Sequence, residues 1–489
     1  MKRNQGNEYR EFGSKIATFL FGVGLSLVSI SAGAQSIPTY TGYDWQAGMM
    51  GGTGGNISYT SYMASHREQH HSAVTSDGAI HIIVNTGVNG AALQLYSSFD
   101  NGSTWCAPIP AFSGTATGDS ATNSTVSTDD VVLVTVGGTE YLQVAYDTDT
   151  AAGGGAIAAL VFAKLTYSPG ASCTSGTPWT VTSSTNVANI SGVTYQQPAF
   201  VEDGHENIWL ADYEITATTN NIVVYERGPH DTDPWNVTPV TIYNPNSGEG
   251  ANGYEHAPRP VYLPTVAGTL GNIGLLYQSY NCLYWVTITD STTPGYQVSY
   301  PPEELSTFSN DMLGCNLVSL QEQDQDTASS NATDRLTGNQ YLGFVSNAAS
   351  GGTNVYALVY DATAGTWGNG TPLTSALYYP YDAVYVKSTF VTAGGSFYSY
   401  MFVNDKNQLG LFESAALPAS ISYMLAGHLS HIPPGTNQSY ADPRIEAPQY
   451  INTSHISFAP VWEQYKYGAY ISPSMPTQQS LIFWNNIPN

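Results

Sequence analysis

The residues best suited to chemistry lie close together near the start of the chain, in His66–His71 with the sequence HREQHH. If this stretch is extended, alternate side chains point to opposite sides, so His66, Glu68 and His70 share one side. Three interpretations are open. The first is a metal site formed by these three side chains. The second is proton transfer, in which a neutral histidine near a tyrosine abstracts an acidic proton while an arginine neutralises a carboxylate. The third is ordinary hydrogen bonding in a polar segment.

The segment that follows the histidines has the pattern of short strands joined by turns. A short strand, Ser72–Thr75, leads to a turn at Asp77-Gly78. Apolar residues then recur at about every second position in Ala79–Asn85 and in Ala91–Ser97, which is typical of strands rather than helices. The unit ends in the octet Ser98–Trp105. The sequence therefore predicts one antiparallel unit that the histidines precede.

Similar units recur along the chain at a spacing of about 50–70 residues. Each has a polar start, two or three apolar strands and often a final tryptophan. The six later units are Val131–Trp179, Tyr195–Trp235, Glu255–Thr289, Cys315–Trp367, Tyr381–Glu413 and Arg444–Trp484. Seven units predict an all-β fold, a β-propeller of seven blades, with six or eight blades as alternatives. A β-sandwich or a parallel β-helix is the other architecture that such a sequence could adopt, and residues 36–60 could supply a strand that closes a propeller.

The expected starts of the inner strands carry polar side chains that would meet at the axis of a propeller. Arginine is scarce in this chain, yet Arg67, Arg259 and Arg444 all fall at such starts. This placement predicts a site that recognises an anion. The alternative is a channel that is simply lined by polar residues and filled with water. The candidate binding residues are His66, Arg67, Gln196, Glu255, His256, Asp382, Arg444 and Glu446.

Residues 1–34 have the features of a signal peptide. Four basic residues precede the apolar run Ile16–Ile30, and the small residues Ala32-Gly33-Ala34 form a cleavage site. An uncleaved anchor is the alternative. We expect the mature protein, residues 35–489, to be secreted (extracellular or periplasmic) and to form a single propeller domain.

The net charge limits the expected partners, and the cysteines allow disulfides. Removing the signal peptide takes away four basic and two acidic residues and changes the net charge from −24 to −26. Such a chain repels nucleic acid and anionic membranes, so we expect neither as a partner. In an exported protein the four cysteines can form disulfides, and we expect Cys106–Cys173 and Cys282–Cys315, one of three connectivities. We expect a monomer that needs no cofactor, with a structural calcium ion left open, and a polysaccharide or oligosaccharide as partner.

The octet Ser98–Trp105 matches the pattern S-x-D-x-G-x-T-W and resembles the Asp box, or bacterial neuraminidase repeat (BNR), of sialidase-superfamily propellers. The resemblance implies that Asp100 bonds turn amides and that Trp105 packs between sheets. It also implies three arginines around a carboxylate and a tyrosine supported by a glutamate, although the early Arg-Ile-Pro signature does not occur. The matching candidates are Arg67, Arg259, Arg444, Glu255 and Glu446.

The run HHSAVTSDGAIHIIVN, starting at His70, resembles the first repeat of propeller polysaccharide lyases of the ulvan lyase and rhamnose–glucuronate lyase type. The resemblance implies catalytic roles for four residues. His70 or His71 matches the first histidine of the family, Tyr195 is a candidate acid/base, and Arg259 is a candidate neutraliser of the substrate carboxylate. Gly87–Asn89 occupies the place where the family has a second histidine.

These observations predict a secreted propeller that cleaves an acidic, uronate-containing glycan at the axial funnel by β-elimination. One alternative is a sialidase-like glycoside hydrolase. A hydrolase of neutral glycans would need two carboxylates at the funnel, and the candidates are Glu255, Asp311, Asp382, Asp442 and Glu446. A non-catalytic glycan-binding propeller and a protein-interaction propeller are the remaining classes.

Overall fold

The computed structural model describes residues 69–85, 93–99, 106, 129–149, 157–173, 177–236, 239–242, 255–263, 272–279, 282–289, 296–300, 302–305, 329–334, 337–347, 353–368, 370–373, 385–393, 396–405, 408–415, 424–428, 444–446, 450–452, 461–466 and 478–483. The chain divides into two compact units, Met1–Pro38 and Thr39–Asn489, and all described residues belong to the second. The predicted signal peptide therefore lies outside the described residues. Among the described residues, no helix is both long enough and apolar enough to cross a membrane.

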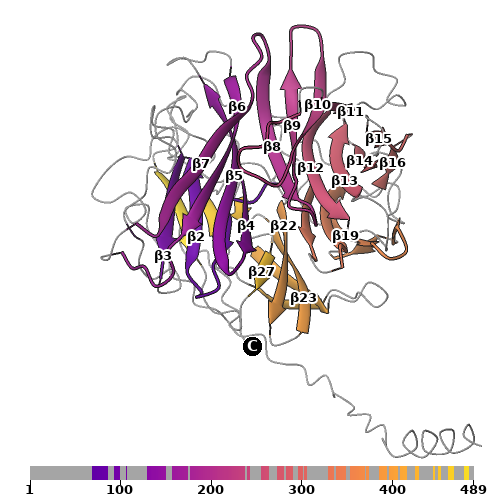
Figure 1. The fold of residues 1–489 in the computed structure, drawn as a ribbon. Helices are drawn as coiled ribbons and strands as arrows, with labels where there is room; N and C mark the ends of the chain where they lie inside the picture. Colours follow the sequence, from indigo (N-terminus) through magenta and orange to yellow (C-terminus); the bar gives the residue numbers. More distant parts are fainter. Residues whose placement is uncertain are drawn as a thin grey trace, which may run out of the picture. The chain divides into compact units, whose positions relative to one another are not determined.

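The described strands form seven sheets that follow one another in sequence order (Figure 1). The first sheet has β1 (Ser72–Val74), β2 (Ile80–Asn85) and β3 (Leu93–Ser98). The second has β4 (Asp129–Val136), β5 (Thr139–Asp149), β6 (Ile157–Tyr167) and β7 (Trp179–Ala188). The third has β8 (Thr194–Glu202), β9 (Ile208–Ile215), β10 (Asn220–Arg227) and β11 (Val240–Ile242).

The later sheets are built from the second half of the chain. The fourth has β12 (Glu255–Leu263), β13 (Asn272–Ser279), β14 (Cys282–Thr289), β15 (Gln297–Val298) and β16 (Glu303–Glu304). The fifth has β17 (Ser329–Thr333), β18 (Gln340–Asn347), β19 (Thr353–Asp361), β20 (Thr366–Trp367) and β21 (Thr371–Pro372). The sixth has β22 (Tyr385–Ala393), β23 (Ser396–Asp405), β24 (Gln408–Ala415), β25 (Met424–His428) and β27 (Tyr450–Asn452). The seventh has β26 (Arg444–Glu446), β28 (Val461–Lys466) and β29 (Gln478–Phe483).

The architecture is an all-β propeller, as the sequence predicts, but the predicted count of seven blades is wrong. Five of the sheets have the four or more strands of a blade, and within the described residues the first and the last sheet have three strands each. The last expected unit is also divided, because β26 joins β28 while β27 pairs in parallel with β22 of the preceding sheet. Hydrophobic alternation predicts where strands occur in the sequence but does not show which sheet each strand joins.

The core lies between neighbouring sheets rather than at one centre. Apolar clusters fill the spaces between the first and second, second and third, third and fourth, and fourth and fifth sheets. A strand between two such clusters is apolar on both faces. In β9, Ile208 and Leu210 are buried on one face, and Trp209 and Ala211 are buried on the other. Burial of a side chain such as Ile208 or Leu210 contributes about 1.5–3 kcal/mol. The outer strand β7 is instead largely exposed in its middle.

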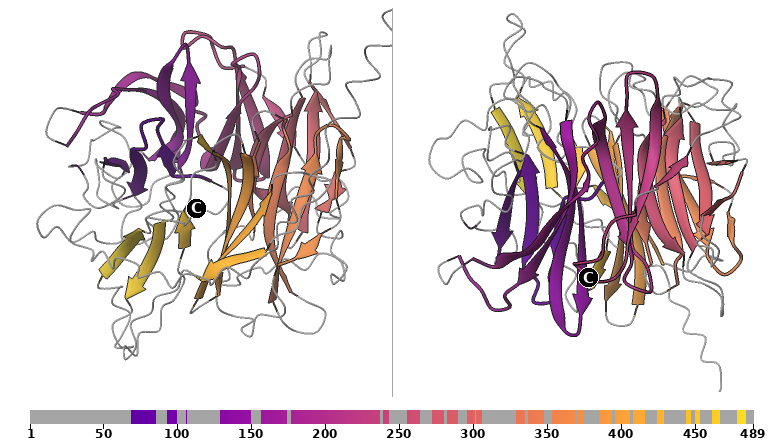
Figure 2. Two further views of the ribbon diagram at one scale, coloured as in Figure 1. Left: turned by 90° about the horizontal axis from the view of Figure 1, so that it is seen from below. Right: turned by 45° about the horizontal axis from the view of Figure 1, so that its top comes forward.

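The first strands of successive sheets lie beside one another, which brings the sequence-distant starts of the blades together (Figure 2). Strand β1 contacts β4, β4 contacts β8, and β8 contacts β12. The turn between β1 and β2 contains Gly78, which has a φ of +85°, a conformation that favours glycine.

Candidate functional site

The side chain of Asp130, at the start of β4, joins four inner segments of the propeller. Its Oδ1 accepts the backbone N–H of His70 at 2.9 Å. Its Oδ2 accepts the backbone N–H of Phe200 at 3.0 Å and Nη1 of Arg259 at 2.6 Å. The carboxylate is fully buried, with 0% of the side chain exposed. Because its three donors come from the start of the first blade, from β8 and from β12, this carboxylate is a fixed reference point at the centre of the fold.

Arg259 is the cation of this site, and it retains free hydrogen-bonding capacity. The residue is 1% exposed, and its ion pair with Asp130 uses Nη1. Its Nε and Nη2 have no hydrogen-bond partner among the described residues. These two nitrogens form the edge of the guanidinium that binds a carboxylate through two parallel hydrogen bonds. Arg227, the other buried arginine of the described residues, also has two guanidinium nitrogens without a partner there, Nε and Nη1. It differs because its guanidinium lies over the rings of Phe162 and Trp235, at 5.0 and 5.4 Å.

His70 crosses from the first blade to the fifth. Its Nε2 lies 3.1 Å from the backbone oxygen of Asn331 on β17. A carbonyl oxygen only accepts hydrogen bonds, so Nε2 carries the proton, and a neutral ring then has its lone pair on Nδ1. The adjacent Gln69 donates from Nε2 to the backbone oxygen of Pro198 at 2.6 Å, next to a bulge in β8. His71 is also buried, and its backbone oxygen accepts the N–H of Ile83 at 2.8 Å.

A second polar group lies between the second and third blades. Burial raises the pKa of Asp212 well above its usual value, and the charges of Glu214 and Asp147 raise it further, while the backbone amides of Gln196 and Tyr213 oppose the shift. Burial likewise raises the pKa of Glu214, which accepts a short hydrogen bond from the hydroxyl of Tyr225. This group contains a carboxyl that stays protonated when ordinary carboxyls are ionised. It lies between second strands, whereas Asp130 and Arg259 lie on first strands.

Two of the four predicted catalytic residues meet in the structure. His70 and Arg259 both bind the carboxylate of Asp130. Tyr195 lies in the apolar cluster between the second and third blades, where its hydroxyl accepts the N–H of Ile190 at 2.8 Å. Burial raises the pKa of Tyr195 to about 12. Gln196 is buried on β8 opposite Tyr213, and its Oε1 has no partner within the described part of the chain.

Seven of the eight predicted binding residues have no described side chain. His66, Arg67 and Asp382 lie outside the described residues. Four more are described by their backbones only. These are Glu255 and His256, which pair with Ser279 and Gln278 in β13, and Arg444 and Glu446, which pair with Glu463 and Val461 in β28.

Sequence reasoning missed Asp130 and Asp212. Asp130 is the second of two aspartates directly before the apolar run of β4, and its position at a strand start was the available signal. Its partners lie 60 to 129 residues away in the sequence, so no local pattern connects them. Asp212 could have been noticed as a carboxyl in the middle of the apolar strand IWLADYEI.

A metal site is one of three interpretations of the histidine segment, and most of the residues of such a site lie outside the described part of the chain. Of His66, Glu68 and His70, only His70 lies within the described residues. Among those residues, no group of three or more histidine, cysteine, aspartate or glutamate side chains could hold a metal ion.

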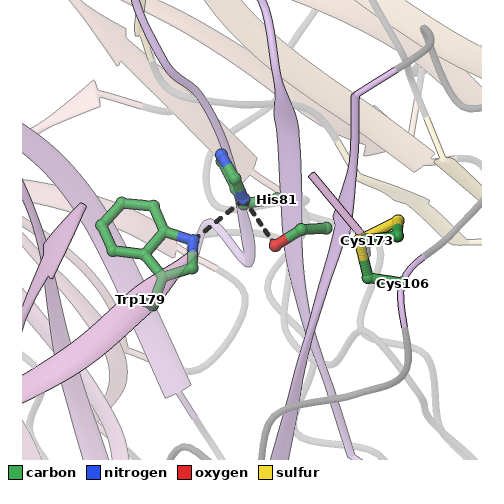
Figure 3. Close-up of a disulfide and its surroundings, with 5 residues drawn as sticks. His81, Cys106, Cys173 and Trp179 are labelled. Atoms are coloured by element: carbon green, nitrogen blue, oxygen red, sulfur yellow. Dashed lines mark hydrogen bonds between the residues drawn. A yellow bond between two sulfur atoms is a disulfide. The ribbon is translucent and has the colours of Figure 1, made fainter. Parts of the chain in front are cut away.

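His81, on β2 of the first sheet, has a structural environment (Figure 3). The indole N–H of Trp179 donates to its Nδ1 at 3.0 Å, and the hydroxyl of Ser97 lies 2.8 Å from the same nitrogen. Burial lowers the pKa of His81 to about 3, and the charge of Asp77 opposes this shift. The ring is therefore neutral, and it joins the first blade to the second.

The predicted disulfide Cys106–Cys173 is confirmed, and it joins the same two blades close to His81 (Figure 3). The predicted partner of Cys282, Cys315, lies outside the described residues, as does the Asp box after Phe99.

No protein-family model and no curated protein matches this chain. Several solved structures are similar to it. The NanB sialidase from Streptococcus pneumoniae is 12% identical, with 87% of this chain and 68% of that chain covered and a TM-score of 0.39. An ulvan lyase, described as a new family of polysaccharide lyase, is 10% identical, with 90% and 96% covered and a TM-score of 0.48. The leech intramolecular trans-sialidase is 10% identical, with 88% and 70% covered and a TM-score of 0.40. Sialidase and polysaccharide lyase propellers are thus found among similar structures, as the sequence resemblances predict.

Proposed function

We propose that this protein is a carbohydrate-active propeller that cleaves uronate-containing glycans by β-elimination at the site around Arg259. The observation that carries the proposal is the buried guanidinium edge of Arg259, with Nε and Nη2 free of partners among the described residues. An unpaired buried donor of this kind costs about 1–3 kcal/mol, so a ligand that supplies the acceptors gains that free energy. A uronate carboxylate supplies two acceptors in the matching geometry.

The guanidinium of Arg259 would make the C5 proton of a bound uronate more acidic. When the guanidinium binds the C6 carboxylate, it stabilises the negative charge that develops there as the proton leaves C5. The C5–H electron pair forms the C4–C5 double bond, the C4–O bond breaks, and the leaving oxygen takes a proton. We assign removal of the C5 proton to the imidazole of His70, because His70 shares the Asp130 carboxylate with Arg259 and a neutral imidazole is a suitable base near neutral pH.

Tyr195 receives no role in this scheme. Its side chain lies in the apolar cluster between the second and third blades, and its hydroxyl accepts the Ile190 amide. A pKa raised to about 12 also makes its ionised form scarce near neutral pH. Export, which residues 1–34 predict, fits an enzyme whose polymeric substrate lies outside the cell.

Substituting Arg259 tests the proposal. Arg259→Lys keeps a positive charge that can reach Asp130 but removes the two-nitrogen edge. We expect kcat/KM on a uronic-acid polysaccharide, followed by the absorbance of the unsaturated product near 235 nm, to fall about 100-fold or more, the effect of losing one donor to a developing oxyanion. Arg227→Lys is the matched control, since Arg227 is also buried but lies on β10, the third strand of its sheet, with its guanidinium over aromatic rings. Equal activity of the two variants would refute the role of Arg259.

A glycoside hydrolase is the second candidate, and the carboxyls between the second and third blades favour it. A protonated carboxyl beside an ionisable one is the arrangement that glycosidases use, and Asp212 and Glu214 provide it. Reducing-end release without absorbance near 235 nm, abolished by Asp212→Asn but retained in Arg259→Lys, would identify this activity.

A further inference from the structure

We propose that Asp130 is a positioning residue of the site, which sets the orientation of both the cation and the base of the reaction. The proposal deepens the proposed function and rests on it. Asp130 is fully buried, and its two oxygens accept three hydrogen bonds, from the backbone of His70, the backbone of Phe200 and the guanidinium of Arg259.

The ion pair determines which edge of Arg259 remains for a ligand. A guanidinium is planar and rigid, so a short hydrogen bond at Nη1 fixes the direction of the Nε–Nη2 edge. The 2.6 Å bond to Asp130 is made at Nη1, on the other side of the group. Without the carboxylate, the arginine side chain would rotate among several conformers, and the edge would lose its fixed direction.

The same carboxylate holds His70. The backbone N–H of His70 donates to Asp130, and the backbone oxygen of His70 accepts the N–H of Val131 at 2.7 Å. His70 is therefore bound on both sides to the start of β4. Its ring is then directed to Asn331 on the fifth blade. His70 and Arg259 are thus both held by the carboxylate of Asp130, so a shift of this carboxylate would change the distance between them.

The decisive experiment compares two buried carboxylates that both connect blades. Asp130→Asn removes the charge and places an amide NH2 against one set of donors. Glu140→Gln makes the same change in a side chain that accepts the N–H and the hydroxyl of Ser76, at 2.8 and 3.0 Å, and so links the first two blades without touching Arg259. Both variants are assayed well below their melting temperatures.

We expect the two variants to differ in catalysis and to resemble each other in stability. Asp130→Asn should lower kcat/KM about 100-fold, through both kcat and KM, because a displacement of about 1 Å at a reacting group costs that much. Glu140→Gln should lower the melting temperature and leave kcat/KM within about three-fold of wild type. In an Arg259→Lys background, Asp130→Asn should lose most of its effect, because residues that act as a unit are not additive.

The outcomes that overturn the proposal are distinct from failure of the proposed function. Folded Asp130→Asn with the kcat/KM of wild type overturns it, as does full additivity with Arg259→Lys. If neither Asp130→Asn nor Asp130→Glu folds at low temperature, the carboxylate is a structural support alone and the proposal is also overturned. If wild-type protein cleaves no uronate glycan, the proposed function fails first, and the positioning role fails with it.

Discussion

The ring of His81 accepts a hydrogen bond from the indole N–H of Trp179, and this contact determines its protonation state. An indole N–H can only donate, so Nδ1 must carry a lone pair. A proton added to Nδ1 would point at another donor in a fully buried site. Nε2 faces the hydroxyl of Thr75 at 3.3 Å, and that hydroxyl donates to Asp77 at 2.6 Å. Charging this ring in the folded protein is therefore unfavourable.

The stability of the protein should depend on pH through His81. Its pKa is 6.5 when unfolded and about 3 when folded, so between these values the unfolded chain binds the extra proton. The stabilising effect is complete above pH 6.5 and is lost as the pH falls, by roughly 1.4 kcal/mol per pH unit. Urea unfolding at pH 7.5 and 4.5 should show that wild type loses more stability on acidification than His81→Gln does. A gap between the two proteins that does not change with pH would contradict this account.

Single residues differ in how far sequence predicts them. His70 and Arg259 could be selected because a histidine cluster and a rare arginine are visible as such, and they proved to bind the same carboxylate. That carboxylate, Asp130, could not be selected, since only the closed arrangement of first strands shows which of two adjacent aspartates points to the axis. Tyr195 shows the converse, because a tyrosine at a strand start can equally face the axis or a neighbouring blade.

At the scale of elements, β5 and β9 place carboxyl groups in an otherwise apolar space. Asp147 on β5 and Asp212 on β9 are both buried, and Asp212 lies opposite the irregular stretch of β8 where Gln197 has a φ of +59°. The surrounding cluster, from Val132 to Tyr225, is apolar. Because water is excluded there, Asp212 keeps its proton to a higher pH than an exposed carboxyl does.

Asp212→Asn should therefore become more favourable as the pH rises. The pKa of Asp212 is raised in the folded state, so its contribution to stability is complete below the unfolded value of 3.8 and is lost as the pH rises through the folded value. Asparagine resembles the protonated acid and does not titrate. The free energy of unfolding of Asp212→Asn relative to wild type, from urea titrations at pH 4 and pH 8, should increase with pH.

Asp203→Asn is the control for this prediction. The carboxylate of Asp203 accepts four hydrogen bonds within its turn, from His205, Trp209 and two atoms of Asn207, so its substitution should destabilise at both pH values. A relative stability of Asp212→Asn that is constant or falls with pH would show that the carboxyl is ionised in the folded protein.

Strand positions could be predicted well, and strand partners less so. The three strands expected after the histidines are present within two residues of their predicted ends, because apolar alternation and the Asp77-Gly78 turn specify them locally. The split of the last unit, with β27 beside β22, could not be predicted, since pairing depends on which sheet edge is open once the chain has closed.

At the scale of the whole molecule, the first two blades are joined by more than packing. The disulfide Cys106–Cys173 and the hydrogen bonds of His81 and Glu140 all connect them. A bridge that spans 67 residues limits the freedom of the unfolded chain substantially. Proximity in a repeat model sufficed to predict this pair, because neighbouring repeats become neighbouring blades. The number of blades did not follow from the same reasoning, since a repeat in sequence need not supply all four strands of a sheet.

The proposed function requires that Arg259, on the first strand of its sheet, binds a carboxylate of the substrate. The most direct test uses wild-type protein and two forms of one uronic-acid polysaccharide, the native polymer and the same polymer with its carboxyl groups reduced to alcohols. We expect the native polymer to give a rise in absorbance near 235 nm and the reduced polymer to give none and to remain intact, because it lacks both the anion and the acidified C5 proton. Equal cleavage of the two polymers, or cleavage of neither across a broad panel of uronic-acid polysaccharides, would contradict the account.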